Sequence, residues 1–338
     1  MNFTRRDFGK IALAALPAGK LLAKPNSTFN GVQIGIIISP TNFHDMPLPA
    51  DEILNNLVQL GISAVETQDV RVESYAGAPP FARADFVGIP VAQSAPAPQP
   101  AGQVQGGARG AGRRTLTPEQ QEARRKASEE LRQWRLSVSM DKYKALHKLY
   151  SEAGVKIYAC RLSTLYNAMP DEEIAYFFNT AEALGANQIT VELPMDPALS
   201  QRMGDFAAKR NIMMGYHNHT QVNFHSWDNA LSQSKHNGIN FDVGHYVAAV
   251  SQSPIPFIEQ YHDRITCLHL KDRKLGTNGG RNMPWGEGDT PLKEVLQMMK
   301  KEKYKFPAGI ELEYRIPEGS TTMAEIGKCL QFCKDALA

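Results

Sequence analysis

The sequence lacks a strong excess of charge of either sign. Its 338 residues include 37 Lys and Arg against 35 Asp and Glu, which gives a formal net charge of +2. Proteins that bind nucleic acid usually carry a marked basic excess, because their Lys and Arg side chains neutralise phosphates. The near balance therefore predicts that nucleic acid is not a partner of this chain.

Cysteine is scarce as well. The chain has four, and none stands in a CxxC or zinc-finger spacing. This excludes a cysteine-built structural zinc site. Cys329 and Cys333 stand four residues apart on an expected C-terminal helix, and we expect them to pack there rather than to form a disulfide, whose geometry is demanding.

Long hydrophobic runs are absent from the N-terminal region. The apolar run at residues 11–16 is far shorter than the roughly 20 residues that a membrane-spanning helix needs. It follows Thr4-Arg-Arg-Asp-Phe-Gly-Lys10, which resembles the bacterial twin-arginine (Tat) export signal. We therefore expect residues 1–27 to be a signal peptide and linker, and the mature protein to be periplasmic with no integral membrane segment. A basic amphipathic terminus is the alternative.

The rest of the chain alternates between helical and strand patterns. The segments LGISAVET, AGVKIYAC and LGANQITVEL are three variants of one helix–Gly–strand junction. Such alternation is typical of parallel βα units. We count eight expected strands, at residues 32–38, 64–68, 155–160, 188–193, 212–218, 240–243, 265–270 and 308–313. Eight is the number that a (β/α)8 TIM barrel needs, so we predict an α/β single-domain barrel over residues 28–338, with a doubly wound open sheet as the alternative.

One segment interrupts this alternation. Residues 88–116 are rich in Pro, Gly, Ala and Gln and contain too little apolar material to order independently. The segment is followed by Thr117-Pro-Glu-Gln120, an N-capping pattern that predicts a helix to about residue 135. The insertion is either a disordered decoration or a lid over a site.

Polar residues collect where the strands end. His217 and His219 have strand spacing and so share one face, and the same holds for Glu311 and Glu313. Because the carboxyl ends of barrel strands meet at one mouth, we expect these side chains to lie together with others from the neighbouring strands. The others are Glu66, Glu192, Asp242, His245, His269 and Lys271. Carboxylates and imidazoles on rigid strands suit one divalent ion, such as Mn²⁺, Mg²⁺, Co²⁺ or Zn²⁺.

Five segments carry a family resemblance. They are Tyr216-His-Asn-His219, Phe241-Asp-Val-Gly-His245, Leu268-His-Leu-Lys-Asp272, Trp285-Gly-Glu-Gly288 and Ile310-Glu-Leu-Glu313. With them the chain resembles the xylose isomerase-like TIM barrels, the sugar phosphate isomerase/epimerase family, over roughly residues 30–335. Ketose epimerases of this superfamily hold one metal with Glu, Asp, His and Glu from strands five to eight.

The resemblance implies a ligand set with one departure. Asp242, His269 and Glu311 match the last three ligands, whereas His217 stands in place of the first glutamate, which in the epimerases is also a catalytic base. Glu192 on the neighbouring strand is a candidate to supply the missing carboxylate. The His-Asn-His variant looks more like the inosose dehydratase-like and 3-keto-sugar branches.

The resemblance, together with these residues, implies a metal-dependent enzyme that removes a proton next to a carbonyl of a carbohydrate, through an enediolate. Isomerisation or epimerisation is the first reading, with a lyase, dehydratase or glycoside-cleaving enzyme on an inosose or 3-keto sugar as the alternative. A periplasmic sugar-binding protein without activity is a further alternative. The expected roles are catalysis by Glu192, His219, Lys271 and Glu313, metal binding by His217, Asp242, His269 and Glu311, and substrate binding by Glu66, His245 and Trp285. Lys271 could instead form an ion pair with Asp272, and the chain could form a homo-oligomer.

The export signal gives a direct prediction. Replacing Arg5 and Arg6 by Lys should leave the precursor in the cytoplasm, because the twin arginines are what the export pathway recognises. Cell fractionation measures the result, and an unchanged periplasmic yield would contradict the signal.

Overall fold

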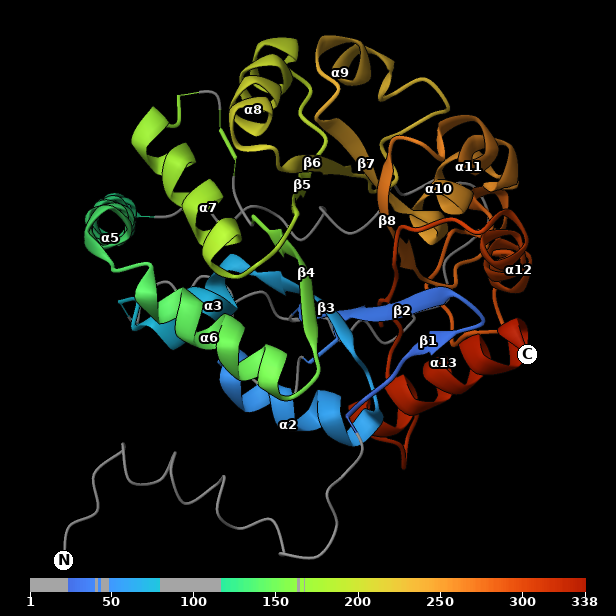
Figure 1. Ribbon diagram of the computed structural model, residues 1–338. Helices are drawn as coiled ribbons and strands as arrows, with labels where there is room; N and C mark the ends of the chain where they lie inside the picture. Colours follow the sequence, from blue (N-terminus) through green and yellow to red (C-terminus); the bar gives the residue numbers. More distant parts are fainter. Residues whose placement is uncertain (1–23, 40–41, 44–48, 80–116, 163–164, 167) are drawn as a thin grey trace, which may run out of the picture.

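The computed structural model describes residues 24–39, 42–43, 49–79, 117–162, 165–166 and 168–338. In this part of the chain eight parallel strands close into a barrel (Figure 1). The strands are β2 (Val32–Ile37), β3 (Ala64–Gln68), β4 (Lys156–Arg161), β5 (Gln188–Glu192), β6 (Met213–His217), β7 (Asn237–Asp242), β8 (Ile265–Leu270) and β9 (Ala308–Ile310). Strand β9 pairs with β2, with Ala308 opposite Ile34, and this pairing closes the barrel. The TIM barrel prediction is confirmed, and the open sheet is wrong.

Helices surround the strands on the outside of the barrel (Figure 1). They are α2 (Ala50–Leu60), α3 (Asp69–Ala76), α5 (Pro118–Ser137), α6 (Asp141–Glu152), α7 (Asp171–Ala183), α8 (Pro197–Arg210), α9 (Asp228–Gln233), α10 (Val243–Val250), α11 (Ile255–Tyr261), α12 (Leu292–Glu302) and α13 (Thr322–Leu337), with a short 3-10 turn, η1 (Gly276–Asn278). A two-residue strand, β1 (Thr28–Phe29), pairs antiparallel with β2. Among the described residues, no helix combines the length and apolar character needed to span a membrane.

The observed boundaries follow the sequence signals closely. Gly61 ends α2 in the left-handed conformation at φ 76°, as expected of a glycine at that position. Thr117 caps α5: its hydroxyl accepts from Gln120 N–H, and the Gln120 side chain accepts from Thr117 N–H, which confirms the capping box. The eighth barrel strand is shorter than predicted, because β9 stops at Ile310 and leaves Glu311 and Glu313 beyond its end. Residues 1–23 of the expected signal peptide and linker at 1–27, and the insertion at 88–116, lie outside the described residues.

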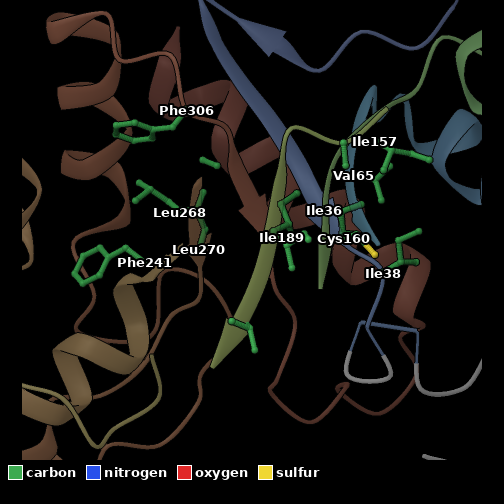
Figure 2. Close-up of a cluster of buried hydrophobic side chains, with 14 of the residues drawn as sticks. Ile36, Ile38, Val65, Ile157, Cys160, Ile189, Phe241, Leu268, Leu270 and Phe306 are labelled. Atoms are coloured by element: carbon green, nitrogen blue, oxygen red, sulfur yellow. The ribbon is translucent and has the colours of Figure 1, made fainter. Parts of the chain in front are cut away.

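The barrel strands are buried on both faces. Figure 2 shows Val65, Ile157, Ile189, Phe241 and Leu268 among the side chains of the hydrophobic core. Val65 and Phe241 directly adjoin Glu66 and Asp242 in sequence, so they point to the opposite face of their strands. This arrangement packs apolar side chains against the helices and leaves the polar ones for the barrel interior. The four cysteines are buried and free, as expected for Cys329 and Cys333.

Two β-bulges each direct one side chain into the interior of the barrel. The register of β3 and β4 shifts so that Tyr158 is an extra residue, and the register of β7 and β8 shifts so that Thr266 is one. A Cβ built on Gly35 or on Gly309 would stand 2.8 Å from the Tyr158 side chain. Thr266 lies against Gly215 and Gly238 in the same way. A Cβ built on Gly215 would stand 2.6 Å from Thr266 Oγ1, and a Cβ built on Gly238 would stand 2.7 Å from Thr266 Cγ2. Each bulged side chain therefore occupies interior space that two glycines leave open.

A buried arginine ties α5 to the barrel. Arg135 Nε lies 2.7 Å from Glu73 Oε1 on α3, and Arg135 Nη1 lies 2.8 Å from Glu173 Oε1 on α7. Only 12% of the Arg135 side chain is exposed. Tyr176 Oη also donates a hydrogen bond to Glu73 Oε1, at 3.0 Å. The Arg135 guanidinium, the two carboxylates and this hydroxyl therefore form one connected network. This network fixes the helix that follows the insertion.

Arg135→Met should destabilise the protein strongly. The change leaves two buried carboxylates without their cation, and breaking a buried pair in this way costs about 3–5 kcal/mol of unfolding free energy. Urea denaturation measures the loss. The matched control is Arg125→Met on the same helix, since Arg125 pairs with Glu122 at the surface and should matter little. Equal effects of the two changes would contradict the role of Arg135.

Candidate active site and metal site

The carboxyl ends of the barrel strands bring together a dense group of ionisable side chains, which we call the mouth cluster. Strands β3 to β8 and the segments that follow β6, β8 and β9 contribute to it, together with the first turn of α10. Its members are Glu66, Arg161, Glu192, His217, His219, Asp242, His245, His269, Lys271, Arg273, Glu311 and Glu313. Every predicted site residue except Trp285 lies in this cluster.

Lys271 stands at the centre of the carboxylates. Its Nζ lies 3.0 Å from Asp242 Oδ2, 3.4 Å from Glu311 Oε2 and 2.8 Å from Glu313 Oε2. Burial acts to lower the pKa of Lys271, but the three carboxylates outweigh it and hold the pKa above its ordinary value. The ammonium group therefore stays charged. The same contacts hold the pKa of Glu311 well below its usual range against the effect of burial.

His269 lies between two carboxylates. Its Nδ1 is 2.8 Å from Glu311 Oε2, and its Nε2 is 3.2 Å from Glu66 Oε2. Burial alone would lower the pKa of His269, but Glu66 and Glu311 outweigh it and raise the pKa well above its ordinary value. Both ring nitrogens therefore carry protons and donate to the carboxylates on either side.

His217 has the opposite character. Burial lowers its pKa far below the ordinary value, and the positive charges of Arg161 and His269 lower it further. Its Nδ1 lies 3.1 Å from Asn240 Oδ1. Its Nε2 is buried and has no hydrogen-bond partner among the described residues. His217 is thus a neutral imidazole with one nitrogen unused.

His219 and Glu192 form a dyad at the more exposed side of the cluster. His219 Nδ1 lies 2.9 Å from Glu192 Oε2, and Arg161 Nη2 holds the other oxygen of Glu192 at 2.5 Å. Burial acts to raise the pKa of Glu192, but the His219 hydrogen bond and Arg161 outweigh it and lower the pKa. The His219 side chain is 39% exposed, so its ring can be reached from the mouth.

His245 lies between two cations. Arg273 Nη1 contacts its Nδ1, and Lys271 Nζ lies 2.8 Å from its Nε2. Burial lowers the pKa of His245 well below its ordinary value, and Lys271 and Arg273 act in the same direction. The ring is therefore neutral. The predicted role of His245 in binding substrate is compatible with its place in the cluster, although only 7% of its side chain is exposed.

The expected ion pair between Lys271 and Asp272 is wrong. Asp272 points away from the cluster and accepts from the backbone N–H groups of Gly286 at 2.8 Å, Gly288 at 2.9 Å and Thr290 at 3.2 Å. A Cβ on Gly288 would stand 1.8 Å from Asp272 Oδ1, so only glycine fits there. Asp272 instead shapes the loop between β8 and α12.

Trp285 belongs to this loop. Its ring packs edge-on against Phe332 of α13, with ring centroids 5.7 Å apart. Its Nε1 is buried and has no hydrogen-bond partner in the described part of the chain. The loop does reach the cluster through Asn282, whose Nδ2 lies 3.4 Å from Glu313 Oε2.

Several members of the cluster could hold a metal ion. Among the described residues, ligand atoms of His217, Asp242 and His269 all lie within 4.8 Å of one another, and the same is true of His217, His219 and His245 and of Glu66, Cys267 and His269. The first set contains three of the four predicted ligands, and the fourth, Glu311, contacts His269.

The charges and the free nitrogen of the cluster fit a divalent cation. Its five carboxylates outnumber its three Lys and Arg side chains by two, and the charged His269 ring leaves one formal negative charge. The unused Nε2 of His217 supplies a lone pair, which a metal ligand needs. A mixed set of nitrogen and oxygen ligands selects no particular ion.

Three polar residues of the site were missed from the sequence. Arg161 ends β4 and Arg273 follows β8, and a basic residue at the end of an apolar strand resembles the signal used for Lys271. Asn240 stands two residues before Asp242 and so shares its face of β7. An amide within an apolar strand is the signal that could have found it.

The fold and site define a (β/α)8 barrel with a polar cluster at its mouth that can hold a cation. Residues 200–333 match the sequence model of a family described as xylose isomerase-like TIM barrel. The match spans β6 to β9 and so includes all four predicted ligands. This confirms the resemblance to that superfamily over the C-terminal part of the chain. No functionally curated protein matches the sequence.

Solved structures share the fold at low sequence identity. A sugar phosphate isomerase/epimerase from Parabacteroides distasonis is 16% identical, with 95% of this chain and 99% of that chain covered and a TM-score of 0.54. The probable 3-DHS dehydratase AsbF of Bacillus anthracis, involved in petrobactin synthesis, is 10% identical, with coverages of 88% and 97% and a TM-score of 0.56. A D-psicose 3-epimerase is 12% identical, with coverages of 90% and 97% and a TM-score of 0.52.

Asp272→Asn should loosen the loop between β8 and α12. The change replaces a charged acceptor of three N–H groups by an amide, and hydrogen bonds to charged groups each contribute about 1.5–3 kcal/mol. Hydrogen exchange of the Gly286, Gly288 and Thr290 amides should become faster. Asp289→Asn is the control within the same loop, because Asp289 accepts from Leu275 N–H instead. Unchanged exchange at residues 286–290 would contradict the role of Asp272.

Proposed function

We propose that this chain is a metal-dependent carbohydrate isomerase or epimerase that removes a proton from a carbon next to a carbonyl. The observation that supports it most is the unused, buried Nε2 of His217 beside Asp242, His269 and Glu311. These four side chains come from four successive strands or their ends. A half-exposed histidine paired with a carboxylate lies next to them.

The proposed ligands are His217, Asp242, His269 and Glu311. His269 would give up one proton on ligation, since ligating nitrogens must be unprotonated. A divalent ion held there would polarise the carbonyl and a neighbouring hydroxyl and stabilise an enediolate. Once His269 has given up that proton, the cluster carries two formal negative charges, which favour such an ion and disfavour a phosphate group at the same place. A free sugar or keto-glycoside therefore suits the site better than a sugar phosphate.

His219 is the proposed base. Its Nδ1 donates to Glu192, which leaves Nε2 free to accept a proton from the substrate. Glu192 has one oxygen on His219 and the other on Arg161, so it orients the ring rather than meeting substrate. The sequence predicted a catalytic role for Glu192, whereas the role proposed here is to position His219.

Lys271 and Glu313 lie on the other side of the cluster from the dyad. The ammonium group of Lys271 stays charged and can stabilise an oxyanion of the substrate. Glu313, 2.8 Å from it and with 19% of its side chain exposed, can return a proton to the substrate. A base and an acid on separate sides of one site suit a change of configuration or a 1,2-shift.

A dehydratase is the second candidate. A dehydratase also removes the proton next to the carbonyl, but a hydroxyl group on the carbon beside the carbanion then leaves. The leaving hydroxyl group needs a proton from a nearby acid. Lys271 beside Glu313 supplies such a donor pair. A sugar-binding protein of the periplasm would need neither an ion nor a base. Location in the periplasm follows from the twin-arginine signal and is part of the proposal.

Metal content and proton exchange test this function together. Protein purified without chelator should contain about one divalent ion per chain, as a mononuclear site requires. Incubation with ketoses, inososes and 3-keto-glycosides in D₂O should place deuterium next to the carbonyl of one substrate class, and chelation should abolish the uptake. The identity of the product then separates isomerase from dehydratase. Full activity without metal would refute the proposal, and bound sugar without any uptake would favour the binding protein.

Glu311 and Glu313 provide a matched pair of variants. Glu311→Gln should lower metal content and activity, because Glu311 is a proposed ligand. Glu313→Gln should keep the metal and lower turnover by about 10²-fold or more, the usual contribution of a general acid or base. Metal analysis measures the effect of each variant on metal content, and steady-state rates measure its effect on turnover. Loss of the metal from Glu313→Gln alone would reverse the two roles.

A further inference from the structure

Asn240 joins four barrel strands through one buried amide. Its Nδ2 lies 3.0 Å from Glu66 Oε2 of β3, 3.0 Å from Thr190 Oγ1 of β5 and 3.0 Å from Cys267 Sγ of β8. On the other side its Oδ1 lies 3.1 Å from His217 Nδ1 of β6. None of the Asn240 side chain is exposed, so no solvent competes for these bonds.

Glu66 determines which way the amide faces. Its Oε2 is a carboxylate oxygen, which accepts hydrogen bonds, and it lies 3.0 Å from Asn240 Nδ2 and 3.2 Å from His269 Nε2. The amide group that faces Glu66 must therefore be the NH₂ of Asn240, and its carbonyl oxygen must face His217. A carbonyl oxygen can only accept, so the hydrogen of the neutral His217 ring is on Nδ1.

We propose that Glu66 and Asn240 are positioning residues that fix the tautomer of His217, with Nδ1 protonated and the Nε2 lone pair directed into the mouth cluster. The inference deepens the proposed function, in which His217 is a metal ligand, because an imidazole can bind a cation only through an unprotonated nitrogen. The partner of the other ring nitrogen commonly fixes a metal-binding histidine in this way. Here Glu66, on β3, orients the amide of Asn240, and this amide in turn orients the ring of His217, on β6.

The tautomer can be read directly in the metal-free protein. Labelling the histidines with ¹⁵N and recording long-range ¹H–¹⁵N correlations distinguishes protonated from unprotonated ring nitrogens, and the signals missing from His217→Gln identify His217. We expect Nδ1 to be protonated and Nε2 to be unprotonated. A proton on Nε2 in the wild-type protein would overturn the inference, and no variant has to fold for this result.

Asn240→Leu tests the part of Asn240, and Thr190→Val is its control. Thr190 Oγ1 contacts the Asn240 amide but not His217, so the control variant should preserve the tautomer. Asn240→Leu removes the acceptor at similar volume, so His217 should shift toward the Nε2–H form. Titration with Mn²⁺ or Zn²⁺ followed by calorimetry should show an affinity about 10–100-fold weaker for Asn240→Leu, the usual effect of losing such a partner.

The outcomes of the spectrum and the titration are distinguishable. An unchanged tautomer in folded Asn240→Leu, as judged by circular dichroism, would show that Asn240 does not set it. If His217 has the stated tautomer but no variant and no wild-type protein binds a divalent ion, the metal-dependent function fails while the positioning role stands.

Discussion

The burial of Lys271 among three carboxylates is the interaction on which the mouth of this barrel depends. Asp242 ends β7, Glu311 and Glu313 follow β9, and each of the three lies within 3.4 Å of the same ammonium group. Carboxylates placed this close in a buried site would repel one another without a cation between them. The lysine therefore allows acidic side chains to gather where a divalent ion can later share them. It also ties the end of β8 to the segment beyond β9, where regular pairing has stopped.

Four histidines of the cluster carry out different tasks because their neighbours differ. His269 has carboxylates on both ring nitrogens and is charged, whereas His245 has cations on both sides and is neutral. His219 donates to Glu192 and stays accessible. His217 donates to an amide and keeps a free nitrogen. One residue type thus supplies a proposed base, a proton donor and ligands within one barrel mouth, and the neighbouring groups decide which role each ring takes.

Side-chain packing in the barrel interior supports the arrangement of the mouth cluster. Tyr158 and Thr266 enter the interior at bulges, each against two glycines that leave room for it. Each bulge also changes which residues lie opposite one another beyond it. Glu66 then lies beside Ala159 and Asn240 lies beside Cys267. In this register the amide of Asn240 contacts both Glu66 and His217, so the bulges stand between packing in the barrel interior and the contacts at the mouth.

Local sequence was enough to predict the barrel and most of the site. Apolar runs that end in polar residues marked the strands, and parallel strands bring their carboxyl ends to one mouth, so Asp242, His269 and Lys271 could be placed together without coordinates. Period-two spacing likewise put His217 and His219 on one side. What each side chain touches depended on residues far away in the chain: Asn240 and Glu66 are 174 residues apart, and the bulges that align them leave no clear local signal. Glu311 and Glu313 were assigned to a strand that ends at Ile310, because strand pairing is decided by the neighbouring strands rather than by the pattern itself. The sequence therefore determined which residues gather at the mouth, while the tertiary structure decided their partners, and with them which nitrogen of His217 faces an acceptor and which is left without a partner among the described residues.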